Sequence, residues 1–280
     1  MTRLAAALAT VAALVVPAAP ARPTVPAFRH VVVIVFENKE FQSVIGSRDA
    51  PTFNAMVHRY ATVVSYYGVA HPSLPNYLAL VSGSTQGIQS DCTTCLVSAR
   101  NLADTLEAAG KTWKLYAEGL PRPGYTGAFS GRYAKKHDPF LYFRDVLASP
   151  ARRDRVVPFA QLRGDLASGA LPDFAFVVPD LCHSMHDCPV RTGDAWLRTT
   201  LPPLLKLPNS VVFVVFDEGS SDARGGGHVP ALALGAAVRP HTRFTSVTSH
   251  FGLLATVEDA WGLERLGRSA QAAPITGIWK

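Results

Sequence analysis

The sequence lacks the features that define several large classes of protein. After the first residues it has no apolar run long enough to cross a bilayer, and no Gly/Ser linker, repeat or low-complexity tract divides it. Basic residues are scattered along the chain, so the net charge of +6 forms no stripe of the kind that binds nucleic acid. We therefore expect one large domain without a transmembrane segment or a nucleic-acid partner.

Common catalytic and nucleotide-binding motifs are also missing. No G-x-S-x-G, H-E-x-x-H or G-x-G-x-x-G pattern occurs, and the absence of the first argues against an α/β-hydrolase serine site. Gly110-Lys111-Thr112 is not a P-loop, because Thr105 stands where the earlier glycine is needed. This segment also falls at a helix-to-strand turn, the reverse of the required order.

The N-terminus has the pattern of a secretory signal peptide. Arg3 precedes an apolar run from Leu4 to Val16, and Ala19 to Ala21 supply the small residues of a cleavage site. This pattern predicts a signal peptide over residues 1–21 and a single mature domain over residues 22–280. The mature protein would then be secreted, or retained in the periplasm or cell envelope.

The sequence has only four cysteines, and they form two local pairs. The spacing of the second pair does not suit a zinc ribbon, and exported proteins favour disulfides. We therefore predict the disulfides Cys92–Cys95 and Cys182–Cys188, with zinc binding by the four thiolates as the alternative.

Short β-branched runs alternate with helical patterns along the chain. The predicted strands cover residues 30–38, 111–118, 173–180, 210–218 and 230–235, and the predicted helices cover 50–61, 73–83, 101–110, 193–205 and 250–263. In the third helix Asn101 is the expected N-cap and Gly110 the expected stop. The alternation predicts an α/β fold with a mostly parallel sheet covered on both faces.

Polar residues that could hold a metal ion follow the predicted strands. Glu37 and Asn38 follow the first strand, Asp180 the third, and Asp217 and Glu218 the fourth. Each pair alone could simply mark the end of a strand. Ligands bind beyond the carboxyl ends of parallel strands, and carboxylate and amide oxygens suit a divalent cation. Their repetition at one sheet edge therefore favours an active site.

Four histidines lie in segments that could contribute to this site. His183 and His186 fall within the predicted Cys182–Cys188 loop, His228 follows a flexible glycine run, and His137 lies in "YAKKHDPF". A lone histidine is more often structural or solvated, so none of the four identifies a site by itself.

Ser73 lies where a helix begins, between Pro72 and Pro75. Prolines fit the first turn of a helix, whose N–H groups have no intrahelical partner. Ser73 could be only the cap of this helix. Alternatively, it is a nucleophile held at the positive end of the helix, where an anionic group is stabilised.

Seven segments in order resemble the bacterial phosphoesterase family, which contains secreted acid phosphatases and phospholipases C within the alkaline phosphatase superfamily. They are "FENKEF", "HPSLPNYLALVSG", "YAKKHDPFLYF", "PDLCHSMHDC", "GDAWL", "FDEG" and "HFGLLATVEDAWGL". The resemblance covers residues 30–263. It implies a three-layer α/β/α sandwich like that of alkaline phosphatase and phosphoryl transfer through a phosphoserine.

The resemblance also implies roles for individual residues. The nucleophile would be Ser73, and one divalent ion (Ca, Mg, Mn or Zn) would be held by Glu37, Asn38, Ser73, Asp217 and Glu218. Many family members have a second aspartate where this chain has the longer Glu218. Further catalytic residues are expected to be His137, His186 and His228, and residues expected to bind the small anionic phosphate ester are His137, His183, His186, Asp187 and His228.

Other functions remain open at this stage. A phospholipase C or other phosphodiesterase shares the chemistry, but such relatives are typically longer. A sulfatase is disfavoured because Tyr77 stands where the maturation motif following Ser73 requires arginine. A secreted binding protein that has lost turnover is a third alternative, since a fold does not prove activity. The expected function is that of a metal-dependent acid phosphatase.

Overall fold

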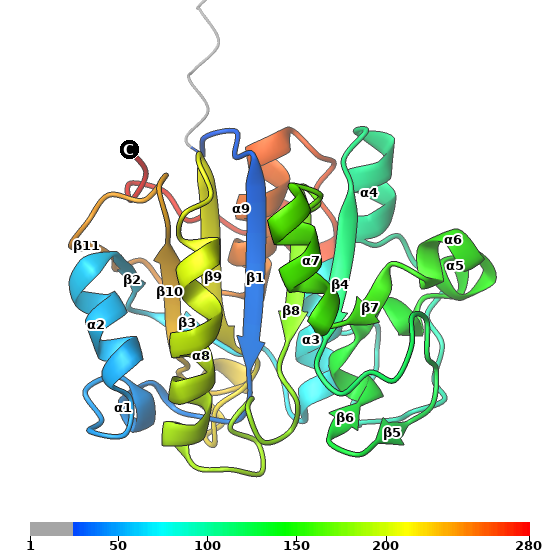
Figure 1. The fold of residues 1–280 in the computed structure, drawn as a ribbon, viewed down its shortest axis with the longest axis horizontal. Helices are drawn as coiled ribbons and strands as arrows, with labels where there is room; N and C mark the ends of the chain where they lie inside the picture. The colour runs from blue at the N-terminus through cyan, green and yellow to red at the C-terminus, as the bar shows by residue number, and fades with distance from the viewer. Residues whose placement is uncertain (1–24) are drawn as a thin grey trace, which may run out of the picture.

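The computed structural model describes residues 25–280, so the predicted signal peptide lies outside the described residues. Eight strands form a central sheet in the order β11-β2-β10-β9-β1-β8-β4-β7 (Figure 1). The strands are β1 (His30–Phe36), β2 (Ala61–Val63), β4 (Trp113–Ala117), β7 (Val156–Pro158), β8 (Phe174–Val178), β9 (Ser210–Phe216), β10 (Ala231–Leu234) and β11 (Thr242–Phe244).

The sheet is mostly parallel, as the sequence predicts. Strand β1 runs parallel to both β8 and β9, so Val31 lies opposite Phe174 on one side and Val211 on the other. Only β10 pairs antiparallel with its neighbours. A strand paired on both edges and covered on both faces has no solvated side, which explains its continuous run of apolar residues.

Helices cover both faces, which confirms the α/β/α sandwich. Figure 1 shows α2 (Pro51–Arg59), α7 (Ala160–Ser168) and α8 (Val190–Leu204) in front of the sheet, with α3 (Ser73–Ser82) and α9 (His250–Trp261) behind it. Helix α4 (Leu102–Ala108) packs against α3. The shorter elements are α1 (Phe41–Val44), α5 (Arg144–Ala148), α6 (Pro150–Arg153) and two small sheets, β3 (Tyr66–Tyr67) with β12 (Thr248–Ser249) and β5 (Phe129–Ser130) with β6 (Tyr133–Ala134).

The predicted ends of α4 are confirmed. The Asn101 side chain accepts a hydrogen bond from Ala103 N, and the Asp104 carboxylate accepts one from Asn101 N, which completes a capping box. Gly110 follows the helix with a φ of 69°, a conformation that glycine adopts without steric cost.

Both predicted disulfides, Cys92–Cys95 and Cys182–Cys188, are present, and they exclude the alternative of four zinc-binding thiolates. Among residues 25–280, no helix is both long and apolar enough to cross a membrane.

Candidate active site

The ends of two neighbouring strands bring four of the predicted site residues together. Because β1 and β9 are parallel and in register from His30 to Phe36, the residues that follow them emerge side by side. Asn38 turns the chain away from β1 with a φ of 50°, which asparagine tolerates better than most residues. In this turn the backbone N–H of Asn38 donates to Asp217 Oδ1 at 3.2 Å.

Ser73 lies against the same acidic groups. Its hydroxyl is 3.0 Å from Glu37 Oε2 and 3.1 Å from Glu218 Oε1, and the side chain is buried. Pro72, not Ser73, is the N-cap of α3, and no side chain caps this end of the helix. The capping interpretation of Ser73 is therefore wrong, because its hydroxyl points at carboxylates rather than at the N–H groups of its own helix.

Three buried carboxylates surround this hydroxyl. Burial and the neighbouring charges of Glu37 and Glu218 raise the pKa of Asp217 well above its usual value. Burial also raises the pKa of Glu218, against the lowering effect of its hydrogen bond with His71. Asp217 Oδ2 is buried and has no hydrogen-bond partner within residues 25–280. A buried carboxylate oxygen left unpaired is costly, and a cation at this position would remove that cost.

Glu37 is ionised, and Tyr77 and His137 hold its carboxylate in place. Burial acts to raise the pKa of Glu37, but the charge and hydrogen bond of His137 and the charge of Lys136 lower it to about 2. Tyr77 Oη donates to Glu37 Oε1, and His137 Nε2 lies 3.1 Å from the same oxygen. The rings of Tyr77 and His137 stack with their centroids 5.0 Å apart. The structure therefore places His137 against Glu37, fully buried, rather than at the open side of Ser73.

Lys136 brings a positive charge close to Ser73. Its Nζ lies 3.5 Å from Ser73 Oγ and donates to Asp91 Oδ2 at 2.8 Å, and its side chain is only 12% exposed. Burial acts to lower the pKa of Lys136, but the charge of Glu37 and the hydrogen bond to Asp91 raise it overall, so the ammonium stays charged. The other oxygen of Asp91 accepts from Leu74 N at 2.9 Å, which fixes Lys136 to the first turn of α3.

His186 lies next to Lys136. Its Nδ1 lies 2.6 Å from Asp187 Oδ1, and because an ionised carboxylate only accepts, Nδ1 is the donor. The other ring nitrogen, Nε2, lies 3.4 Å from Lys136 Nζ. Of the four predicted histidines, His186 is therefore the one whose ring contacts Lys136 beside Ser73, with Nε2 as the acceptor.

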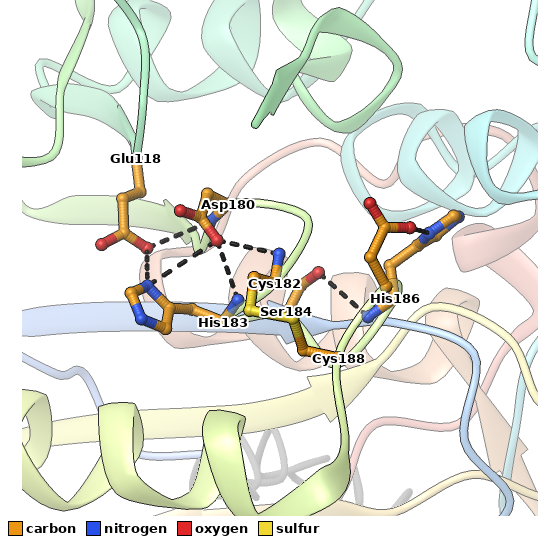
Figure 2. Close-up of a disulfide and its surroundings, with 8 residues drawn as sticks. Glu118, Asp180, Cys182, His183, Ser184, His186 and Cys188 are labelled. Carbon is orange, nitrogen blue, oxygen red and sulfur yellow. Dashed lines mark hydrogen bonds and ion pairs between the residues drawn. A yellow bond between two sulfur atoms is a disulfide. The ribbon is translucent and has the colours of Figure 1, made fainter. Parts of the chain in front are cut away.

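His183 belongs to a different cluster, which it forms with Glu118 and Asp180. Its Nδ1 lies 2.9 Å from Glu118 Oε2 and 3.7 Å from Asp180 Oδ1, and the ligand atoms of the three side chains lie within 4.8 Å of one another, close enough to share a metal ion. Figure 2 shows His183 turned toward Glu118 while His186, on the same disulfide loop, points the opposite way. The Cys182–Cys188 loop therefore places His183 beside Glu118 and Asp180, and His186 beside Lys136.

The structure does not bring His228 into either cluster. Its Nε2 bonds to Val64 O at 2.7 Å, and its ring is stacked on Phe41 and packs against Tyr67. The hydrogen bond and the ring contacts fix the His228 imidazole in the packed interior of this region. The surroundings of His228 therefore do not support its expected role in catalysis.

Several residues of the site were not predicted. Lys136 directly precedes His137 in the sequence, and Asp91 directly precedes Cys92. Tyr77 is four residues after Ser73, so the two side chains lie on the same face of α3. His71 was also missed: its Nδ1 contacts Glu218, and its Nε2 lies 3.1 Å from Ser221 O. The helical spacing of Tyr77 from Ser73 was the clearest usable signal.

The site opens through a pocket of about 460 Å³ at the end of β9. The residues that line it are Asn38, His71, Pro72, Glu218, Gly219, Ser220 and Asp222. Because Glu218 lines it, this pocket gives a small ligand access to the carboxylates beside Ser73.

The sequence model of the Phosphoesterase family matches residues 47–264. A phosphatidylinositol-3-phosphatase of Mycobacterium tuberculosis is 36% identical over 265 residues, which are 92% of this chain and 85% of that protein. An acid phosphatase of Aspergillus fumigatus is 29% identical over 77% of this chain, which spans 52% of that protein.

Solved structures agree on the architecture. A protein in the alkaline phosphatase superfamily from Vibrio parahaemolyticus matches with a TM-score of 0.59 and 15% identity, over 89% of this chain and 71% of that one. At this identity the likeness concerns the fold alone.

Proposed function

Because the chain belongs to the Phosphoesterase family, we propose that it is a phosphoric monoester hydrolase in which Ser73 attacks the phosphorus atom. Membership in this family, and relatives named as phosphatases, make it a hydrolase of phosphate esters. The finer proposal depends on one observation. The Ser73 hydroxyl lies 3.0 Å from a carboxylate oxygen of Glu37, 3.1 Å from one of Glu218 and 3.5 Å from the ammonium of Lys136.

The acidic side fits one divalent cation. Glu37, Asn38, Asp217 and Glu218 offer carboxylate and amide oxygens, the donor set that Ca²⁺, Mg²⁺ and Mn²⁺ prefer and that Zn²⁺ also accepts. The unpaired, buried Asp217 Oδ2 supports this fit. Together with Ser73 Oγ, these four residues would hold the ion. When bound, it would lower the pKa of the Ser73 hydroxyl and offset the charge of the phosphate.

The chain's own residues account for the remaining requirements. Glu218 Oε1 already accepts the hydrogen bond of Ser73 and can take its proton as the Oγ–P bond forms. The bond from phosphorus to the ester oxygen breaks, and that oxygen leaves with a proton from water, which becomes hydroxide. Lys136 and the first turn of α3 stabilise the charge on the non-bridging phosphate oxygens.

Hydrolysis of the phosphoserine completes the cycle. The hydroxide attacks phosphorus, the Ser73 Oγ–P bond breaks, and Glu218 returns its proton to Ser73 Oγ. In this scheme His137 and Tyr77 position Glu37, and they do not touch the substrate. We further propose export through residues 1–21, because their pattern is that of a signal peptide.

Acid-quenching the enzyme during turnover of p-nitrophenyl phosphate tests this proposal. We expect inorganic phosphate release and a phosphorylated Ser73 peptide by mass spectrometry, with little release of choline from phosphatidylcholine. Choline release in place of monoester hydrolysis would assign the chain to the phospholipases C. Full activity of Ser73→Ala would remove Ser73 from the mechanism.

A further inference from the structure

A second polar pocket lies beside the candidate active site and has no role in the scheme above. Its volume is about 430 Å³, and it is formed by the segment that leads to Ser73, the loop after β9, the first turn of α9 and residues near the C-terminus. The residues that line it are Tyr67, Gly68, Val69, Arg224, Val247, Thr248, Ser249, Phe251, Gly252, Arg268, Gln271, Ala272 and Ala273.

Two arginines give this pocket its charge. The Arg224 guanidinium lies 5.2 Å from the centre of the Tyr67 ring, and the Arg268 guanidinium lies 4.5 Å from the centre of the Phe251 ring. Neither side chain forms an ion pair with any described residue of the chain, and no aspartate or glutamate lines the pocket. Both guanidinium groups are thus oriented by aromatic rings and keep their N–H donors free for an anion.

The start of α9 adds neutral and backbone donors. Ser249 is the N-cap of this 12-residue helix and accepts from Phe251 N at 3.4 Å, while Phe251 and Gly252 in its first turn line the pocket. The first N–H groups of a helix have no intrahelical partner and favour a negative group nearby. Thr248 and Gln271 offer further hydrogen-bonding side chains. The pocket therefore combines two cations with neutral donors and contains no carboxylate.

The pocket is within reach of a ligand bound at Ser73. Val69 on its wall is four residues before Ser73, so their Cα atoms are at most ~14 Å apart even if the chain is fully extended. The loop that carries Arg224 also reaches the site, because Asp222 lies 3.8 Å from His71 Nε2. The same loop is joined to the segment before Ser73 by a hydrogen bond from Gly68 N to Gly227 O at 3.1 Å.

We propose that this pocket binds a second anionic group of the substrate while its phosphate monoester lies at Ser73. The proposal rests on the phosphatase function above and adds the substrate class: molecules that carry two separated anionic groups, such as bisphosphates. Arg224 and Arg268 form forked hydrogen bonds with the distal group, because guanidinium matches the geometry of phosphate oxygens. They lower KM for such substrates and leave the chemistry at Ser73 unchanged.

Matched substrates test this proposal. Hydrolysis of alkanediol bisphosphates of increasing chain length is compared with hydrolysis of the corresponding alkyl monophosphates. For the wild type, we expect KM to be about tenfold lower for the bisphosphate at one optimal length, a ratio worth ~1.4 kcal/mol. In the double variant Arg224→Gln/Arg268→Gln we expect this ratio to fall to about one, with kcat for p-nitrophenyl phosphate unchanged.

Controls separate this proposal from the proposed function. Arg243→Gln, at an exposed arginine of the edge strand β11, should keep the preference for bisphosphates. Inorganic sulfate added to the monophosphate reactions should not raise their rate, because a free anion is not linked to the reacting group. A preference that survives in the double variant, or no preference in an active wild-type enzyme, would overturn the proposal while leaving the phosphatase function intact. Activation by free sulfate would also overturn it.

Discussion

Two clusters of acidic side chains lie at the same edge of the sheet, yet they differ in how their charges are satisfied. Around Ser73, the carboxylates of Glu37, Asp217 and Glu218 are buried together, and Asp217 Oδ2 has no partner within the described chain. In the other cluster, Asp180 Oδ1 accepts from the backbone N–H groups of Cys182 and His183.

Glu118, the second carboxylate of that cluster, is also paired. It accepts from Asp180 N at 3.1 Å and contacts the His183 ring (Figure 2). Both carboxylates there are partly exposed and already paired, so they need no cation to be stable. The comparison teaches that acidic residues at a strand end do not by themselves identify a metal site. An unpaired carboxylate oxygen buried near the proposed nucleophile is the stronger sign.

The largest expected effect is that of Ser73→Ala. Because this substitution removes the proposed nucleophile, we expect kcat for p-nitrophenyl phosphate to fall at least ~1,000-fold with the fold retained. The matched control is Ser82→Ala, a buried serine at the other end of the same helix whose hydroxyl bonds to Leu78 O. Equal activity losses in the two variants would mean that Ser73 acts only through stability.

Asp217→Asn and Asp180→Asn compare the two clusters directly. We expect kcat/KM to fall about 100-fold in Asp217→Asn, because one charged oxygen donor of the proposed cation site is lost. In Asp180→Asn the remaining carbonyl oxygen can still accept the two backbone hydrogen bonds, so we expect a change within about twofold. Steady-state kinetics at saturating metal measures both. A larger loss in Asp180→Asn would reverse the assignment of the clusters.

The cationic side of Ser73 is tested by Lys136→Ala. Loss of the ammonium should raise the inhibition constant of inorganic phosphate about tenfold, with partial recovery in Lys136→Arg, because an arginine can still bind phosphate oxygens. The neighbouring Lys135 bonds to Thr93 O, away from Ser73, and Lys135→Ala is the control. Unchanged phosphate inhibition in Lys136→Ala would show that Lys136 does not bind the phosphate.

The smallest expected effect on activity comes from a buried carboxylate far from the site. Glu258 in α9 accepts from Leu266 N and Ser269 Oγ, and burial raises its pKa from 4.5 to about 7. Between these two pKa values the folded protein binds more protons at Glu258 than the unfolded chain does. Its contribution to the free energy of unfolding therefore falls as pH rises, by up to ~3 kcal/mol.

Glu258→Gln should remove this dependence. Relative to the wild type, the variant's free energy of unfolding in urea should increase between about pH 5 and about pH 8, with activity unaffected. A constant difference between the two proteins would contradict the pKa shift. The raised pKa of Glu258 results from burial and is not a sign of a role in catalysis.

Much of the fold could be predicted because each central strand has a sequence pattern that is recognisable by itself. β1, β8 and β9 are apolar throughout since both faces are covered, and the residues after them mark the carboxyl edge. The edge strands β7 and β11, and β2 next to β11, have three residues each, too few for a readable pattern. Their positions depend on contacts with strands far away in the sequence.

The site could be predicted only in part, for the same reason. Glu37 and Asp217 follow recognisable strands, so their meeting could be anticipated. The fates of His183 and His228 could not, because Glu118 and Val64, which hold their rings, are 65 and 164 residues away. Lys136 was overlooked because nothing in its local sequence shows that Asp91 turns it toward Ser73.

The central claim is that the buried carboxylates around Ser73 hold the ion on which catalysis depends. Its most direct test is to strip the wild type, Asp217→Asn and Asp180→Asn of metal, resupply single divalent ions, and measure bound metal together with p-nitrophenyl phosphate hydrolysis. We predict that the wild type and Asp180→Asn regain about one ion per chain and their activity, while Asp217→Asn regains neither. Full activity of the stripped wild type, or equal recovery in all three proteins, would contradict the account.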